Sequence, residues 1–89
     1  MVFSKPPWPD WFEWELDCSN PHLGKRMTGR GFTETDLRRM LEHPILIRPD
    51  HVPGRWLVTA EHGRETWEIV VEPDDLARVL VVVTAYSVG

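Results

Sequence analysis

The sequence predicts an α+β fold, in which two N-terminal helices pack on a mostly antiparallel sheet of four to five strands. Two capped segments between residues 19 and 42 carry apolar side chains at helical spacing. After residue 44 the chain turns to short β-branched runs separated by Gly, Pro and Asp. A length of 89 residues suits one modest core. We therefore expect one domain overall, with an arm and first edge strand over residues 1–19 and an α+β domain over residues 20–89.

The first sixteen residues are rich in proline and tryptophan. The segment "SKPPWPD" at 4–10 holds three prolines, which remove backbone donors and restrict the backbone, so we expect an extended arm that serves as a tail or a lid. "WFEWEL" at 11–16 alternates imperfectly and predicts a first strand at a sheet edge. The three tryptophans of this region either complete the core or present an aromatic surface to a partner or to nucleobases.

The first helix is predicted to end near Thr28, before the segment Gly29–Gly31. Pro21 suits its first turn, where the missing amide donor costs nothing. Two polar residues can cap it, Ser19 or Asn20. Its apolar stripe consists of two residues four apart, Leu23 and Met27.

The second helix is predicted over about residues 34–42. Thr33, followed three residues later by Asp36, resembles a capping box with aspartate in place of the usual glutamate. Pro44 ends the segment. Its inward side is expected to carry Leu37, Met40 and Leu41.

Four strands are expected after the helices, in "ILIRPD", "RWLVTAE", "ETWEIVVE" and "ARVLVVVTAY". Turns are expected at "HVPG", "HGR" and "PDD". The last strand reads as a central strand that is apolar on both sides. The strand register across residues 72–75 stays open, because a shift of one residue exchanges the two faces. One face of the middle two strands is expected to pair Trp56 and Val58 with Trp67, Ile69 and Val71.

Charge and cysteine content restrict the class of protein. The net charge is −4, although residues 22–48 carry six Lys or Arg against three Asp or Glu. The acidic total argues against strong nonspecific nucleic-acid binding, which depends on cationic contacts to phosphates. Cys18 is the single cysteine, so an internal disulfide is excluded; we expect a cytoplasmic protein without a signal peptide or membrane segment. The four histidines are scattered, and neither a metal site nor a cofactor motif is expected.

His22, Arg26 and Arg30 form the first candidate site, because residues four apart lie along one side of a helix. One interpretation is a neutral imidazole base beside guanidinium groups that bind phosphate. The other is a solvated helix edge whose arginines lie near the negative end of the helix dipole, which is the more common reason for such a pattern.

Glu68, Thr84 and Tyr86 form the second candidate site. If the open register places Glu68 on the face of the other two, a carboxylate, a hydroxyl and a phenol line one polar patch. Otherwise they are ordinary polar residues on a half-solvated sheet. Arg64 lies beside a predicted turn, where a polar residue needs no functional reason.

Four segments together resemble a known group of proteins: "PHLGKRMTGRGFTETDLRRML", "PGRWLVT", "WEIVVEP" and "VLVVVTAY". They resemble a bacterial small-domain family with the pattern His, Arg-Met, Arg, a short helix and a valine-rich closing strand that ends Thr-Ala-Tyr. This family is similar to BrnT-type toxins of toxin–antitoxin pairs and to the wider RelE, barnase, EndoU and colicin-like ribonucleases. The similarity covers about residues 20–86.

The resemblance implies a RelE-like fold and a toxin-type endoribonuclease that needs no metal or cofactor. Its expected partners are RNA or the ribosome and an antitoxin protein. The alternative is a non-catalytic protein-interaction domain with the same fold. The implied catalytic residues are His22 as base or acid, Arg26 and Arg30 as phosphate clamps, and Tyr86 or Thr84 as a positioning hydroxyl; the implied substrate-binding residues are Lys25, Glu68 and Arg64.

Overall fold

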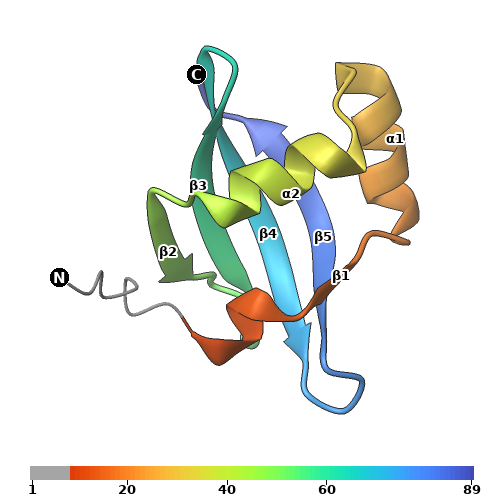
Figure 1. The fold of residues 1–89 in the computed structure, drawn as a ribbon, viewed down its shortest axis with the longest axis vertical. Coiled ribbons are helices and arrows are strands. Elements are labelled where there is room, and N and C mark those ends of the chain that lie inside the picture. Colours follow the sequence, from red (N-terminus) through yellow and green to blue (C-terminus); the bar gives the residue numbers. More distant parts are fainter. Residues whose placement is uncertain (1–8) are drawn as a thin grey trace, which may run out of the picture.

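The computed structural model describes residues 9–89, which form an α+β fold with two α-helices on a five-stranded mixed sheet (Figure 1). A short 3₁₀ helix, η1, precedes these elements. The predicted arm over residues 4–10 lies mostly outside the described residues. In chain order the elements are η1 (Asp10–Glu13), β1 (Glu15–Asp17), α1 (Pro21–Arg30), α2 (Glu34–Glu42), β2 (Leu46–Pro49), β3 (Trp56–His62), β4 (Glu65–Asp74) and β5 (Val79–Ser87).

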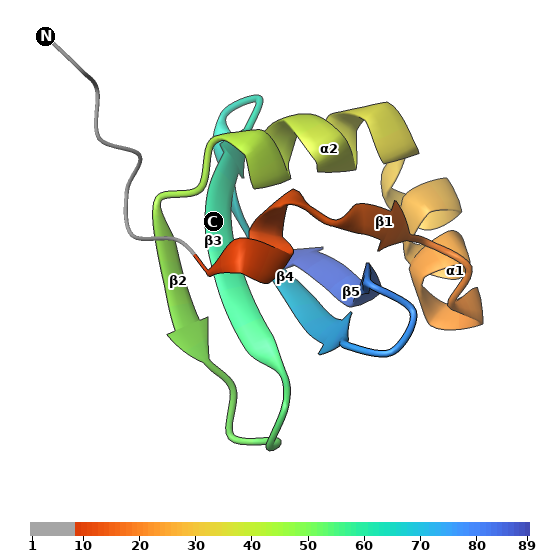
Figure 2. The same ribbon diagram turned by 60° about the horizontal axis from the view of Figure 1, so that its bottom comes forward.

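The strand order is β1-β5-β4-β3-β2. β1 runs parallel to β5, and all other neighbouring strands are antiparallel. α2 crosses one face of the sheet, and α1 lies beside β5 (Figures 1 and 2). The predicted fold class is confirmed at this level, and the first strand lies at an edge as expected. The prediction that the last strand is a central strand is confirmed, because β5 lies between β4 and β1 and pairs with both.

The hydrophobic core lies between the helices and one face of the sheet. Along β3 and β4 the buried side chains alternate, and the register sets Val58 opposite Ile69 and Ala60 opposite Trp67, as the alternating pattern predicted. The core cluster consists of Leu23, Phe32, Leu37, Met40, Leu41, Val58, Ala60, Trp67, Ile69, Val71, Leu80, Val82 and Ala85.

The first part of the predicted strand 11–16 is instead the 3₁₀ helix η1. The Phe12 N–H donates to the Pro9 carbonyl at 3.0 Å, and the Trp14 N–H donates to the Trp11 carbonyl at 3.1 Å. A strand would send Trp11 and Phe12 to opposite faces, whereas both pack against the core, and the Trp11 ring lies 5.6 Å from that of Trp56. For Trp11, the structure therefore supports the core-completing role.

Both helices have the caps that the sequence predicted. The Asn20 side chain accepts the His22 N–H at 2.9 Å, and Thr33 and Asp36 form a reciprocal capping box. α1 continues two residues beyond the predicted end, to Arg30, because Gly31 rather than Gly29 takes the left-handed conformation, with a φ of 72°. No helix of the described residues is long and apolar enough to cross a membrane.

The two C-terminal hairpins differ in how well the sequence predicted them. β3 and β4 are joined at Gly63 and Arg64, where the turn was expected, and Gly63 has a positive φ of 64°. The turn predicted at 73–75 was wrong: β4 continues through Pro73 and Asp74, and the turn occupies residues 75–78. The Asp74 carboxylate accepts the N–H groups of residues 76 and 77 at 3.1 and 3.0 Å, which stabilises this later turn.

Replacing Thr33 with alanine is expected to lower the free energy of unfolding by about 1 kcal/mol, the typical cost of losing a helix N-cap. The Thr33 hydroxyl accepts the Asp36 N–H at 3.2 Å, and the Asp36 carboxylate accepts the Thr33 N–H at 2.9 Å. Chemical denaturation of the variant and the wild type measures the difference. Thr35→Ala, at an exposed position outside the capping box, is the matched control. Equal losses in the two variants would contradict the capping role.

Candidate functional site

A hollow of about 400 Å³ lies between α1 and β5. It brings together four of the residues that the sequence singled out, and they supply an imidazole, an ammonium, a guanidinium and a hydroxyl group. α1 can lie against β5 here because β1 pairs only with residues 79–81 and leaves the later part of β5 uncovered at its edge. The lining residues are His22, Lys25 and Arg26 from α1 and Val83 and Thr84 from β5.

α1 is held in this position by its apolar side. Leu23 is 0 % exposed in the core, and Met27 packs against the same cluster. The helical periodicity then places His22 and Arg26, each one residue before these anchors, at the side that faces Val83 and Thr84. Burial of the apolar side thus presents the polar side chains to β5.

The cations of α1 are unpaired among the described residues. The helix contains no Asp or Glu, and His22, Lys25 and Arg26 are exposed. Arg26 does not pair with Glu68, which binds another arginine instead. The positive charge at the hollow is therefore not neutralised within residues 9–89. The described ion pairs lie elsewhere, between Arg38 and Glu34, Arg48 and Glu68, His51 and Asp50, and Arg55 and Glu72.

A register shift in β5 decides which face Thr84 occupies. Val70 pairs with Thr84, whereas Val71 pairs with Val82, so Val83 is an extra residue on β5. Strict alternation would place Thr84 on the same face as Val82, in the core. The bulge instead keeps Val82 inward and turns Thr84 to the sheet face opposite the core, at the edge of β5 where α1 lies. The same shift sends Tyr86 to that face.

Glu68 and Tyr86 lie on the face away from the helices and form a second polar cluster. Tyr86 is opposite Glu68 in the register and donates its hydroxyl proton to Glu68 Oε1 at 3.2 Å. Arg48 from β2 donates to Glu68 Oε2 at 2.7 Å. Burial raises the pKa of Tyr86, and the neighbouring Glu68 charge raises it further. Tyr86 thus stays protonated, and its hydroxyl donates its hydrogen bond to Glu68.

Sequence analysis missed Arg48 as a member of this cluster. The alternation in "ILIRPD" places Arg48 on one side of a short strand, which is an available signal. The sequence could not identify Glu68 as the partner of Arg48. Arg48 on β2 reaches Glu68 on β4 only because β3 lies between these two strands in the sheet.

Replacing Glu68 with glutamine is expected to lower the pKa of Tyr86 toward its ordinary value. The substitution removes the negative charge beside the phenol but leaves burial, the largest cause, in place, so the shift is partial. Tyr86 is the single tyrosine, and an absorbance titration of tyrosinate therefore reports this group alone. The control is Glu72→Gln. Glu72 lies on β4 like Glu68, but its carboxylate pairs with Arg55. Identical titrations for Glu68→Gln and the wild type would contradict the assigned contact.

The raised pKa of Tyr86 also means that the folded state loses stability at high pH. The folded state holds the phenol proton more tightly than the unfolded chain does. This contribution to stability is fully present below the ordinary tyrosine pKa of 10.0 and is lost as the pH rises through the raised value.

Several candidates lie outside the hollow. Arg30 ends α1 and Arg64 lies in the β3–β4 turn, and neither lines the hollow. Burial raises the pKa of Cys18 to about 11, which keeps the thiol protonated and unsuited to act as a nucleophile. Within residues 9–89 no group of His, Cys, Asp or Glu side chains could hold a metal ion.

Comparisons with protein-family models, with curated protein sequences and with solved structures find no significant match to this chain.

Proposed function

We propose that the protein is a metal-independent, toxin-type endoribonuclease with a RelE/BrnT-like fold, and that it binds an RNA phosphate in the α1–β5 hollow. The observation that carries the proposal is the grouping of His22, Lys25, Arg26 and Thr84 around one hollow with no acidic partner. Ammonium and guanidinium groups hold phosphate oxygens, and an imidazole can transfer a proton near neutral pH.

The proposed reaction needs no metal, because the attacking group belongs to the RNA. His22 takes the proton of a ribose 2′-hydroxyl, whose oxygen then forms a bond to the adjacent phosphorus. The bond from phosphorus to the 5′ oxygen of the next nucleotide breaks, and a 2′,3′-cyclic phosphate and a 5′-hydroxyl result. Lys25 and Arg26 stabilise the charge that develops on the phosphate oxygens, and the Thr84 hydroxyl donates to one of them.

The leaving 5′ oxygen takes its proton from water in this scheme. Tyr86 does not line the hollow, and its hydroxyl hydrogen is donated to Glu68. In the proposal Tyr86 and Glu68 therefore shape the neighbouring sheet surface, and their part is to position the RNA rather than to transfer protons.

The experiment that tests the proposal is incubation of the purified protein with bacterial RNA in buffer that contains a chelator, with and without ribosomes. We expect fragments that carry 2′,3′-cyclic phosphate ends. If cleavage requires ribosomes, the substrate is RNA bound to the ribosome. Arg26→Ala is expected to weaken RNA binding, whereas Arg39→Ala removes another exposed helical arginine that lies outside the hollow and is the matched control. Intact RNA in both arms would refute the nuclease.

The second candidate is a non-catalytic interaction domain in which α1 docks a partner. The observation that favours it is that the lining of the hollow includes one imidazole and no carboxylate, so no general acid completes the site. RNA that is retained but never cut would support binding without catalysis.

In the toxin proposal an antitoxin protein would inhibit the enzyme by covering the α1 cations.

A further inference from the structure

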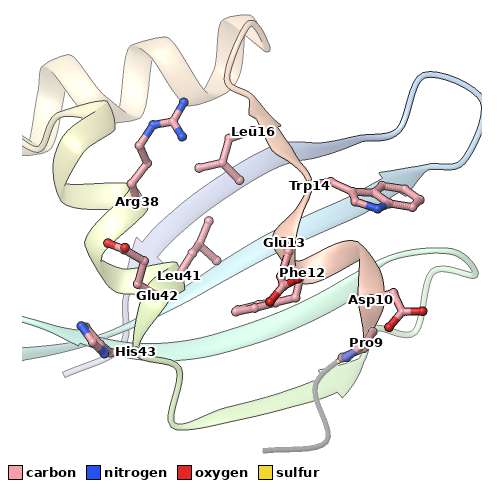
Figure 3. Close-up of a pocket in the computed structure, with 10 residues that line it drawn as sticks. All are labelled: Pro9, Asp10, Phe12, Glu13, Trp14, Leu16, Arg38, Leu41, Glu42 and His43. Atoms are coloured by element: carbon pink, nitrogen blue, oxygen red, sulfur yellow. The ribbon is translucent and has the colours of Figure 1, made fainter. Parts of the chain in front are cut away.

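A groove of about 700 Å³ lies between α2 and the segment formed by η1 and β1 (Figure 3). It shares no lining residue with the α1–β5 hollow. Its lining comes from α2 and from the consecutive elements η1 and β1, which are distant from α2 in sequence, and Pro9 stands at the start of the described residues. The lining residues are Pro9, Asp10, Phe12, Glu13, Trp14, Leu16, Arg38, Leu41, Glu42 and His43.

The interior of the groove is apolar. Figure 3 shows Phe12 and Leu16, from the η1–β1 segment, on the side of the groove that faces Leu41 of α2. Leu41 belongs to the buried core, whereas Phe12 and Leu16 are only partly buried and pack against that core from outside. Trp14 also lines the groove, and the Arg78 guanidinium lies 5.4 Å from its ring centroid, within the range of a cation–π contact. The groove therefore offers apolar area beyond the core of this small domain.

The polar lining of the groove is acidic. Carboxylates of Asp10 and Glu42 lie along it. The one arginine of the lining, Arg38, already binds Glu34 at 3.0 Å on its own helix. Residues 9–16, which supply one wall, include three Asp or Glu and no Lys or Arg. An approaching group would thus meet negative charge around an apolar interior.

We propose that this groove binds a basic amphipathic segment of a partner protein. Apolar side chains of the segment would enter between Leu16 and Leu41, and its Lys or Arg side chains would face Asp10 and Glu42. Charge complementarity selects this occupant, because a nucleic acid or an acidic segment would set negative charge against the carboxylates. Amphipathic segments commonly dock in this way, with apolar anchors in a groove and charges at its edge.

The test uses the full chain and three synthetic peptides of equal length. The first peptide has leucine at helical spacing i, i+3, i+4 and i+7 with lysine elsewhere. The second has the same composition in scrambled order, and the third has glutamate in place of lysine. Binding is followed by titration with NMR detection of backbone amides. We expect only the first peptide to bind with a salt-dependent affinity, and the largest chemical-shift changes at Leu16, Leu41 and Glu42.

Charge-reversal variants locate the binding. The pair Asp10→Lys and Glu42→Lys is expected to weaken binding of the lysine peptide about tenfold at low salt, since two attractions become repulsions. The control pair Glu61→Lys and Asp75→Lys makes the same change in net charge at exposed positions outside the groove. A comparable loss in the control pair would show general attraction to an acidic protein and would overturn the proposal.

Three further results would also overturn it. One is the absence of binding by all three peptides. A second is the appearance of contacts between residues 1–8 and Leu16 or Leu41, which would mean that the chain fills its own groove. A third is a dimer in sedimentation experiments that is disrupted by Asp10→Lys and Glu42→Lys, which would make a second copy the occupant.

Discussion

Replacing His22 with alanine is expected to slow RNA cleavage by about 10²–10⁴-fold, the usual cost of removing a general acid or base. His22 is the one imidazole that lines the α1–β5 hollow, and no carboxylate lies there to replace it. Because Lys25 and Arg26, the proposed phosphate-binding groups, remain in this variant, RNA affinity should change little. Single-turnover cleavage measures the chemical step, and a separate binding titration measures the affinity.

The control for this prediction is His51→Ala. His51 is highly exposed and contacts Asp50, away from the hollow, so its removal should leave cleavage unchanged. A folded His22→Ala protein that cleaves RNA at the wild-type rate would eliminate His22 as the proton acceptor. A variant that loses binding and cleavage in proportion would instead make His22 a phosphate-binding group.

Replacing Leu23 with alanine is expected to lower the free energy of unfolding by about 2–5 kcal/mol, the range found when a buried leucine leaves a cavity. Leu23 is 0 % exposed and is the fully buried residue of α1, so its packing in the core helps to hold this helix against the sheet. For a domain of this size the melting temperature should fall by roughly 4–8 °C for each kcal/mol. Thermal and chemical denaturation measure both quantities.

The matched control is Lys25→Ala, which shortens an exposed side chain on the same helix and should change stability little. Under mild destabilisation, Leu23→Ala should also weaken RNA binding, because the hollow exists only while α1 lies on β5. Equal stability of the two variants would contradict the role of Leu23 as the anchor of α1.

Local interactions account for the parts of the fold that the sequence predicted well. α2 was expected over residues 34–42 and is found there, since Thr33 and Asp36 determine its start within four residues of chain. Likewise the alternation along β3 and β4 correctly identified their buried faces, because the period of two is a property of each strand by itself. The spacing of His22 and Arg26 similarly placed both on one side of α1.

Two elements were predicted wrongly from the sequence, the first part of the strand at 11–16 and the turn at 73–75, because contacts in the folded chain outweighed the local sequence pattern. The alternation at 11–16 suggested a strand, but Trp11 and Phe12 both pack against the core, and a 3₁₀ turn allows this. Pro73 suggested a turn, yet it pairs with Leu80 inside β4, and the Asp74 carboxylate moves the turn to the following residues. At 11–16 packing against a distant part of the chain outweighed the local pattern, whereas at Pro73 the turn was moved by contacts within the same hairpin.

The sequence by itself determined the α+β class, the two capped helices, the buried faces of β3 and β4, and the basic side of α1, because each depends on spacing within a single element. Only the tertiary structure decided that Thr84 lies beside the basic side of α1, while Tyr86 and Arg48 both donate to Glu68. The physical reason is the extra residue Val83, which changes the face of every later side chain of β5. Such a shift is selected by the packing of Val82 and Ala85 against the same core, which no local pattern in the strand encodes.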